Sequence, residues 1–267
     1  MVKTRLDLLL VERKLVESRN LAQRLVMAGQ VRVGGQVVYK PATQVEPSAG
    51  IEIVTGPRFV SRGGEKLDAA MVQFGLDVNG KTCADVGSST GGFVDCLLQR
   101  GAKKVYAVDV GKGLLHWKLR QRVEVVVMES TNARLVTSLP ETIQFLSMDA
   151  SFISLKTLLP VVRNWLAPDG EMVVLIKPQF EAGRKEAARG DGVIRDSQIH
   201  RQVLENILTY AQSIGLRAGG LIRSPLHGPK GNIEFLAWLR QIGEAGEVKK
   251  LVEGAMIELP EEVTPPA

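Results

Sequence analysis

Residues 1–58 have the apolar spacing of a small α+β domain. Residues 5–16 and 18–29 place apolar side chains at helical intervals, which predicts two short amphipathic helices. Residues 31–39 alternate around two adjacent glycines and predict a tight hairpin. A further strand is expected at 51–54, and the turn-like residues 55–58 then predict a connector.

From residue 59 the pattern changes to apolar strands that alternate with amphipathic helices. Strands are expected near 82–87, 104–109, 123–128, 143–149 and 171–177, and helices near 91–100, 113–120 and 155–166. A long helix near 197–213 precedes closing strands near 217–223 and 232–239, and a polar segment at 181–197 predicts a mobile loop. This alternation predicts a Rossmann-like α/β domain over 59–243, a parallel sheet covered by helices on both faces, followed by a tail at 244–267.

Positive charge is concentrated in the amino-terminal part. Residues 1–40 contain eight lysines and arginines against three acids, whereas the rest of the chain contains equal numbers of basic and acidic side chains, so the net charge of +5 belongs to the first domain. Such a concentration favours a face that binds a polyanion, although a run of charge is also typical of an ordinary solvated surface.

Composition excludes several other classes. No apolar stretch approaches the roughly 18 residues of a membrane span, and the first residues lack the core of a signal peptide. The two cysteines, Cys83 and Cys96, fall in apolar segments without a C-x-x-C pair, and the chain has only three histidines. We therefore expect a cytoplasmic protein without a metal site or a membrane partner.

A turn rich in small residues is the main candidate for a binding site. Residues 84–93, Ala-Asp-Val-Gly-Ser-Ser-Thr-Gly-Gly-Phe, read as a strand that breaks into a turn and then opens a helix. Asp109 ends the next strand, about 20 residues further on, where an acid suits the two hydroxyls of a ribose. An adenosine-type cofactor is therefore expected at this edge of the sheet, although a glycine turn can also serve only helix–strand packing.

The spacing of the glycines distinguishes between cofactors. The turn Gly87-Ser-Ser-Thr-Gly91-Gly92 has serine where the second glycine of G-x-G-x-x-G should fall. It does not fit G-x-x-x-x-G-K-[ST] either, because no lysine follows Gly92. Asp85 precedes the turn, where it would repel a pyrophosphate but attract a cation, and S-adenosyl-L-methionine carries a sulfonium and an ammonium. The candidate cofactor-binding residues are Asp85, Gly87, Ser88, Ser89, Gly91, Gly92, Phe93, Asp109, Val110 and Asp149, with Glu129 either contacting the adenosine or facing solvent.

Four charged residues stand where the pattern predicts burial. Asp149 and Lys177 end apolar strands, Glu234 interrupts another, and Lys66 opens the helix before the sheet. A buried lysine must be paired or neutral. Each residue alone is compatible with a structural salt bridge, such as one between Lys177 and Glu234, as well as with catalysis.

Taken in order, Lys66, Asp149, Lys177 and Glu234 match the Lys-Asp-Lys-Glu tetrad of FtsJ-like ribose 2′-O-methyltransferases. The surrounding motifs resemble the TlyA (hemolysin A) family over residues 3 to about 240: Val60–Leu67, Asp85–Phe93, Asp95–Leu98, Val105–Val110, Ser151–Ser154, Lys177–Phe180 and Gly231–Glu234. Residues 1–55 resemble the RNA-binding module of ribosomal protein S-four, the alpha-L fold. The residues that carry this likeness are Arg5-Leu-Asp7, Ser18-Arg19, Ala22 and Gly29–Gly35.

This resemblance implies methyl transfer from S-adenosyl-L-methionine to a ribose 2′-hydroxyl of ribosomal RNA, free or in subunits. It also implies that Arg5, Arg19, Arg24 and Arg32 contact RNA. Burial and a neighbouring cation both lower the pKa of a lysine, so we expect Lys66 to help Lys177 act as the base. We expect Asp149 to orient Lys177 and balance the sulfonium, and Glu234 to align the ammonium or the ribose.

Two other functions stay open at this point. One is an RNA-binding assembly protein that holds the cofactor without turnover, although such a protein has no need for two lysines in one cleft. The other is a pore-forming hemolysin, for which the sequence offers no membrane-spanning segment.

Overall fold

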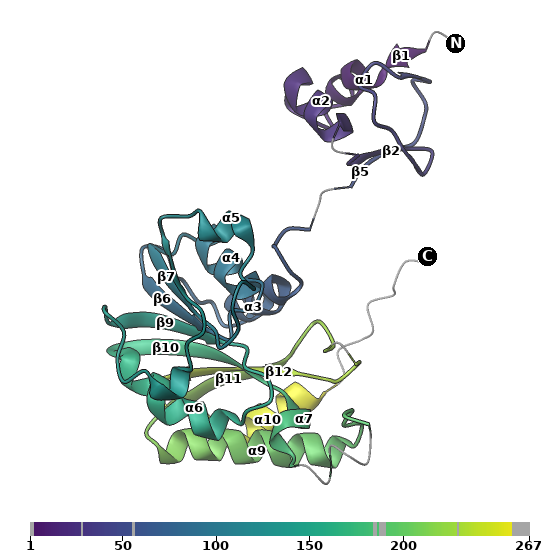
Figure 1. Cartoon of the computed structure of the whole chain (residues 1–267). Coiled ribbons are helices and arrows are strands. Elements are labelled where there is room, and N and C mark those ends of the chain that lie inside the picture. The colour runs from purple at the N-terminus through teal and green to yellow at the C-terminus, as the bar shows by residue number, and fades with distance from the viewer. Residues whose placement is uncertain are drawn as a thin grey trace. The chain divides into compact units, whose positions relative to one another are not determined.

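The computed structural model consists of two compact units, one ending at Arg58 and the other beginning at Phe59 (Figure 1). The structure describes residues 3–27, 29–54, 57–183, 186, 191–228 and 230–257. Parts of the predicted connector, of the predicted mobile loop at 181–197 and of the tail lie outside these residues. Within them, no helix is long and apolar enough to cross a membrane.

The first unit packs two helices against short strands. Helices α1 (Leu6–Glu12) and α2 (Arg19–Met27) accompany the antiparallel strands β2 (Val31–Val33), β3 (Gln36–Val37) and β5 (Ile51–Ile53), and β1 (Thr4–Arg5) pairs with β4 (Gln44–Val45). Gly34 and Gly35 both have positive φ, which is the backbone that a tight hairpin needs. The core contains Leu6, Leu10 and Val26, all fully buried.

The second unit is built on a seven-stranded sheet. Its strands are β6 (Thr82–Val86), β7 (Lys104–Val108), β8 (Val125–Met128), β9 (Ile143–Met148), β10 (Leu166–Ile176), β11 (Arg217–Arg223) and β12 (Phe235–Arg240), in the order β11-β12-β10-β9-β6-β7-β8. The pairs among β6 to β10 are parallel, whereas β12 runs antiparallel to both of its neighbours. The sheet is therefore mixed and not wholly parallel as the sequence predicts, because β12 enters it between β10 and β11 in the opposite direction to both.

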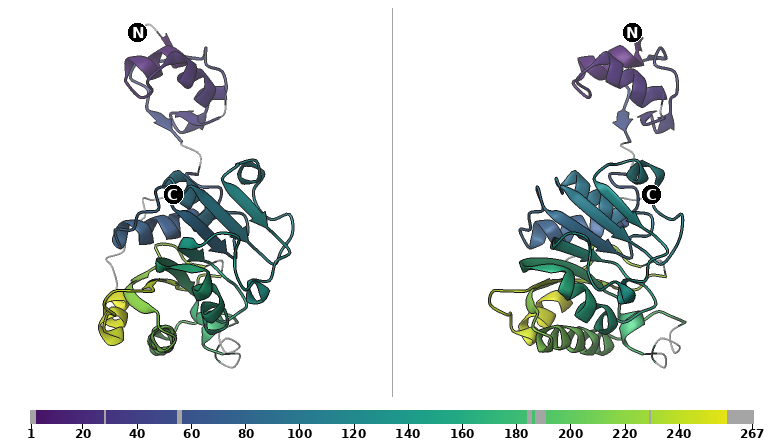
Figure 2. Two further views of the ribbon diagram at one scale, coloured as in Figure 1. Left: turned by 90° about the vertical axis from the view of Figure 1, so that its left-hand side faces the viewer. Right: turned by 60° about the vertical axis from the view of Figure 1, so that its left-hand side comes forward.

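Helices cover both faces of this sheet. Helices α3 (Gly63–Gln73), α4 (Gly92–Gln99) and α5 (Trp117–Arg120) pack on one face, and α6 (Leu155–Val162), α9 (Ser197–Ser213) and α10 (Val248–Met256) pack on the other. Figure 2 shows α9 and α10, in green and yellow, on the side of the sheet opposite to α3 and α4. The short elements η1 (Ala133–Leu135), η2 (Arg163–Trp165) and α7 (Pro178–Glu181) complete the unit.

The carboxyl edge of the parallel strands brings the predicted residues together. Strands β7, β9 and β10 end at Val108, Met148 and Ile176, directly before Asp109, Asp149 and Lys177. Parallel strands end at the same edge, so these three side chains belong to one edge of the sheet.

Candidate functional site

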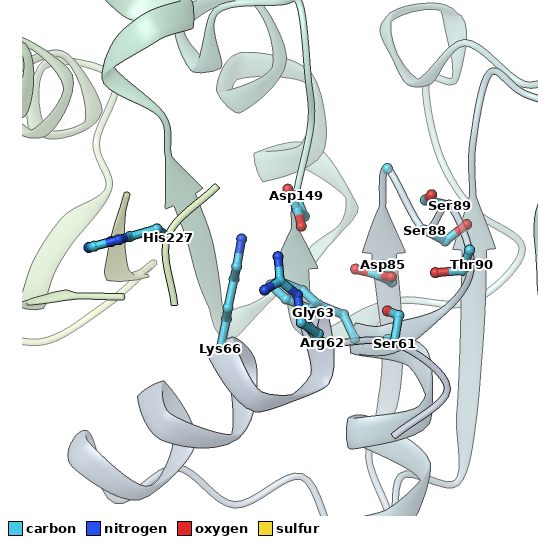
Figure 3. A pocket seen from close by; sticks show the side chains of 13 residues that line it. Ser61, Arg62, Gly63, Lys66, Asp85, Ser88, Ser89, Thr90, Asp149 and His227 are labelled. Carbon is cyan, nitrogen blue, oxygen red and sulfur yellow. The ribbon is translucent and has the colours of Figure 1, made fainter. Parts of the chain in front are cut away.

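Two cavities of about 430 Å³ each lie at this carboxyl edge and share Gly87, Ser89 and Asp149. The first is also lined by Ser61, Arg62, Gly63, Lys66, Asp85, Ser88, Thr90, Gly92, Phe93 and His227. The second is lined by residues that include Asp109, Val110, Leu114, Asn132, Ser151 and Phe152. Figure 3 shows Lys66 and Arg62 extending from the start of α3 toward the side of the first cavity where Asp149 lies.

The turn between β6 and α4 requires its glycines. A Cβ at Gly87, whose φ is 81°, would lie 2.6 Å from the carbonyl oxygen of Asp149. A Cβ at Gly92 would lie 2.3 Å from Ser61 Oγ, and one at Gly91 would lie 2.3 Å from Leu119 Cδ1. A side chain at Gly87 or Gly92 would therefore clash with neighbouring atoms in the wall of the first cavity. Gly91 lines neither cavity, and its missing side chain leaves room for Leu119 of α5.

Asp85 provides a buried acceptor beside the first cavity. Its side chain is 1% exposed, and Oδ1 accepts a hydrogen bond of 2.6 Å from Ser147 Oγ, whereas Oδ2 has no hydrogen-bond partner among the described residues. Burial raises the pKa of Asp85 to about 8; the Ser147 hydroxyl opposes this rise, and the charges of Asp149 and Asp109 add to it. An orphaned buried carboxyl oxygen fits a cationic ligand, because a positive charge would satisfy it and favour its ionised form.

Asp109 lies in the wall of the second cavity and is held by the backbone. Its Oδ2 accepts a hydrogen bond of 2.8 Å from Ser89 N, and Oδ1 accepts one of 2.7 Å from Gly111 N. Each oxygen keeps a further lone pair. The carboxylate is therefore fixed in place and can still accept two hydroxyl donors.

Glu129 lies outside both cavities. It accepts hydrogen bonds from Gly113 N, Leu114 N and Leu115 N, and it pairs with the Arg120 guanidinium. The backbone N–H groups of Gly113 and Leu115 are the main cause that lowers its pKa to about 2. These bonds replace the first helical turn that the sequence predicts at 113–116, which is why α5 is shorter than expected.

The four tetrad residues form two lysine–carboxylate pairs. Lys66 Nζ lies 2.5 Å from Glu234 Oε2, and Lys177 Nζ lies 2.5 Å from Asp149 Oδ1. Lys177 also donates a hydrogen bond of 2.8 Å to Ser151 Oγ. The expected contact between Asp149 and Lys177 is present, and Lys66 pairs with Glu234. The bridge is not Lys177–Glu234, as the structural alternative had it.

An aromatic residue that the pattern of the sequence does not single out lies beside this pair. Phe152 is 90% exposed and has a φ of 63°, which is unusual for a bulky side chain. Its ring centre is 4.9 Å from that of Phe180, and the Lys177 ammonium is 5.8 Å from the Phe180 ring centre.

Asn132 and Arg62 are further cavity residues that sequence reasoning misses. Asn132 caps η1 by accepting a hydrogen bond from Arg134 N, and it lines the second cavity. Its position after the third parallel strand is a signal that could have found it, because every loop at this edge borders the site. Arg62 precedes α3, a helix that lies outside the strand–turn–helix repeat, and no spacing marks it.

Asn232 fixes the segment that precedes α9 to the segment before β12, which carries Glu234. It is 4% exposed, donates a hydrogen bond of 2.8 Å to Gly192 O and accepts one of 3.0 Å from Ile194 N. A Cβ at Gly228 would lie 2.6 Å from Glu234 Oε1. The carboxylate of Glu234 is therefore enclosed by backbone on the side away from Lys66.

In the amino-terminal unit, the predicted RNA-binding arginines fall into two groups. Asp7 is fully buried and accepts hydrogen bonds from Arg5, Arg19 and Gln23. The bond from Arg5, with those from Gln23 and Arg19, holds the pKa of Asp7 well below its usual range. Arg5 and Arg19 thus compensate the buried charge of Asp7, and part of each guanidinium is still exposed to solvent.

Arg24 and Arg32 form the second group. Both are exposed, one on α2 and one on β2. Over the described residues, no group of three or more His, Cys, Asp or Glu is arranged to hold a metal ion.

Comparisons with known proteins agree with this architecture. The FtsJ-like methyltransferase family matches residues 59–241, and the S4 domain matches residues 4–51. A Bacillus subtilis protein named YqxC, provisionally described as an rRNA methyltransferase, is 45% identical over 97% of this chain and 94% of its own. The 16S/23S rRNA (cytidine-2′-O)-methyltransferase TlyA of Mycobacterium tuberculosis is 43% identical over 89% of this chain and 90% of its own.

A solved structure from Streptococcus thermophilus, provisionally described as a hemolysin, has a TM-score of 0.70 and 41% identity, and covers 96% of both chains. The family matches and the full-length relatives agree on both units of the chain. The protein therefore belongs to the TlyA (hemolysin A) family of FtsJ-like methyltransferases with an amino-terminal S4 domain.

Proposed function

We propose that this protein transfers a methyl group from S-adenosyl-L-methionine to a ribose 2′-hydroxyl of ribosomal RNA. The observation that carries the proposal is the pair of Lys177 and Asp149, 2.5 Å apart at the carboxyl edge, with Asp149 lining both cavities. Lys177, the proton acceptor of the pair, thus lies beside Asp149, which lines both cavities. The name of the Mycobacterium tuberculosis relative supports a cytidine as the acceptor nucleotide.

The cofactor, when bound, supplies an electrophilic methyl group on a positively charged sulfur. Asp85 and Asp149 would hold its positive charges, Asp109 would accept from its ribose hydroxyls, and Val110 and Leu114 would contact its adenine. The turn Gly87–Phe93 would lie beside its methionine part. These assignments are supported by the orphaned Asp85 Oδ2 in the first cavity and the fixed carboxylate of Asp109 in the second.

Lys177 acts as the base. It accepts the proton of the acceptor 2′-hydroxyl, and Asp149 then stabilises the ammonium that forms. The bond from the methyl carbon to the cofactor sulfur would break as the bond to the ribose oxygen forms, which would leave a neutral thioether. Ser151 and Asp149 together fix the direction of the Lys177 Nζ, so the lysine is in place before the acceptor arrives. Lys66, held by Glu234, orients the acceptor ribose.

The amino-terminal unit supplies affinity for RNA. Its exposed arginines, Arg24 and Arg32 together with the free edges of Arg5 and Arg19, bind phosphates. Since only RNA carries a 2′-hydroxyl, an RNA-binding unit and a base for that hydroxyl serve one substrate. A ribosomal RNA substrate places the enzyme in the cytoplasm.

The test is incubation of the purified protein with radiolabelled S-adenosyl-L-methionine and ribosomal subunits that lack the modification. We expect label in the RNA, at a 2′-O-methylated cytidine found by mapping, and none with the Lys177→Ala variant. Protein that binds both cofactor and subunits but transfers no label would instead support an assembly protein.

A further inference from the structure

The loop between β7 and the edge strand β8 exposes large apolar side chains. Val110 is 71% exposed, Leu114 46%, Trp117 59% and Val123 93%. Tryptophan is usually well buried, and apolar side chains gathered in one exposed segment are typical of a binding surface. We call residues 110–123 the Trp117 loop.

The Trp117 loop is also basic. Between Asp109 and Glu124, which bound it, all of its charged side chains are basic: Lys112, Lys118, Arg120 and Arg122. Arg120 pairs with Glu129 and Arg122 pairs with Glu124. For Lys112 and Lys118 the described part of the chain shows no acidic partner, so both ammonium groups are available to an anion.

The geometry around the indole suits stacking beside a phosphate. The Lys118 ammonium lies 5.9 Å from the centre of the Trp117 ring. The His116 ring lies 5.9 Å from the same centre and is inclined by 28° to it. An exposed aromatic ring with a cation close to it is an arrangement that proteins use to bind unpaired nucleotides.

We propose that Trp117 stacks on an unpaired nucleobase of the RNA substrate while Lys118 and Lys112 bind the neighbouring phosphates. The proposal rests on the proposed function, since it assigns a second contact surface to the same substrate. Val110 and Leu114 of this loop line the second cavity, so RNA bound to Trp117 lies on the loop that borders the cofactor.

RNA fits this loop better than a protein partner does. A protein interface would be served by the apolar side chains alone, whereas Lys112 and Lys118, which have no acidic partner among the described residues, are complementary to a polyanion. Stacking on indole also tolerates any base, because every base has a flat face.

The experiment measures the binding of protein-free ribosomal RNA and of intact subunits to Trp117→Ala and Trp117→Phe. Loss of one stacked base weakens binding by roughly five- to a hundredfold, so we expect a loss in this range for alanine and a smaller one for phenylalanine. Binding of the cofactor and the unfolding temperature should not change, because the side chain is exposed.

Tryptophan fluorescence gives an independent reading. Of the three tryptophans, Trp165 is 2% exposed and Trp238 is half-buried. Single-stranded oligocytidine should therefore quench the wild-type emission through Trp117, and this quenching should disappear in Trp117→Phe.

A lysine pair provides the matched control. Lys118→Ala should weaken RNA binding, whereas Lys156→Ala should not, although Lys156 also lies over an aromatic ring, 5.6 Å from the centre of Tyr210. An equal loss of RNA affinity in both variants would mean that any surface lysine contributes through its charge alone, and would overturn the proposal.

Other outcomes separate this inference from the proposed function. Wild-type protein that binds and methylates RNA while Trp117→Ala binds protein-free RNA equally well would overturn the inference alone. Weaker binding to subunits but not to protein-free RNA would mean that the loop contacts a ribosomal protein, which also overturns it. Wild-type protein with no affinity for ribosomal RNA would overturn both.

Discussion

Lys66 and Glu234, which are 168 residues apart in the chain, meet in a buried ion pair of 2.5 Å. The lysine comes from α3, ahead of the sheet, and the glutamate comes from the residue before β12, the antiparallel strand. Their side chains are 10% and 1% exposed, so neither charge can be solvated if the other is removed.

Glu234→Gln should therefore destabilise the second unit strongly. Removing one partner of a buried pair costs about 3–5 kcal/mol, because the other charge stays buried without compensation. The free energy of unfolding in urea measures this loss. Glu247→Gln is the matched control, since Glu247 forms an exposed pair with Lys250, and it should leave stability unchanged.

The double variant Lys66→Met/Glu234→Leu tests the cause of that loss. Apolar residues of similar size often replace a buried pair without a net cost. We expect most of the stability to return, while methyl transfer stays absent. A double variant as unstable as Glu234→Gln would mean that packing around Gly228 and Glu234, and not the unpaired charge, carries the effect.

Lys177→Arg separates a base from an ion-pair partner. Arginine can keep a charged contact with Asp149, but its guanidinium does not give up its proton at accessible pH. We expect no methyl transfer from Lys177→Arg or Lys177→Ala in single-turnover assays, with cofactor affinity by calorimetry close to wild type. Normal turnover by the arginine variant would assign Lys177 a structural role only.

Asp85 predicts a dependence of stability on pH. The folded protein keeps the Asp85 proton to about pH 8, whereas the unfolded chain releases it near pH 4. The free energy of unfolding without cofactor should therefore fall as pH rises between these values, by at most about 1.4 kcal/mol per pH unit from this group. Asp85→Asn should remove that part of the slope, and Asp169→Asn, which changes an exposed aspartate, should not.

Cofactor binding should show the opposite trend at the same residue. A cation beside Asp85 favours the ionised carboxyl, so affinity should rise with pH up to about 8 and binding should release a proton. Calorimetry in buffers of different ionisation enthalpy measures that proton. Affinity that is equal at pH 6 and pH 8 would remove Asp85 from the cation site.

The two groups of arginines in the amino-terminal unit should respond differently to alanine. Arg24→Ala and Arg32→Ala should each lower the slope of log affinity against log salt by about 0.7–0.9, if each arginine contacts one phosphate. Neither should change stability, because both side chains are exposed. Unchanged salt slopes in both variants would place RNA recognition elsewhere.

Arg5→Ala and Arg19→Ala should weaken RNA binding and also destabilise the unit. Both arginines donate to the fully buried Asp7, which would lose part of its compensation. Thermal unfolding of each variant measures the structural part of the effect, and the salt slope measures the phosphate contact.

The edge of the sheet and one of its two charge pairs could be predicted from the sequence, whereas the other pair could not. Asp109, Asp149 and Lys177 each follow an apolar strand, and parallel strands end together. We expected the contact of Asp149 with Lys177, which the structure contains. The pairing of Lys66 with Glu234 depends on how α3 and the segment before β12 meet the sheet, which no local pattern encodes.

Glu129 illustrates the same limit at short range. From its position after β8, we expected Glu129 either to contact the adenosine or to face solvent. The structure adds a third role, in which the carboxylate binds the backbone of residues 113–115. The helical propensity of residues 113–115 cannot reveal that their N–H groups bind a side chain, because that side chain, Glu129, comes from beyond β8.

The hydrogen bonds of Asn232 limit which residues can replace it. Its amide uses a donor and an acceptor at once, on Gly192 O and Ile194 N. Aspartate would set a carboxylate against that carbonyl, and leucine would leave both backbone groups unsatisfied in a buried place. We expect other residues at position 232 to be rare in related proteins. They should occur only where the segment before α9 has a different conformation, so that the groups equivalent to Gly192 O and Ile194 N find other partners.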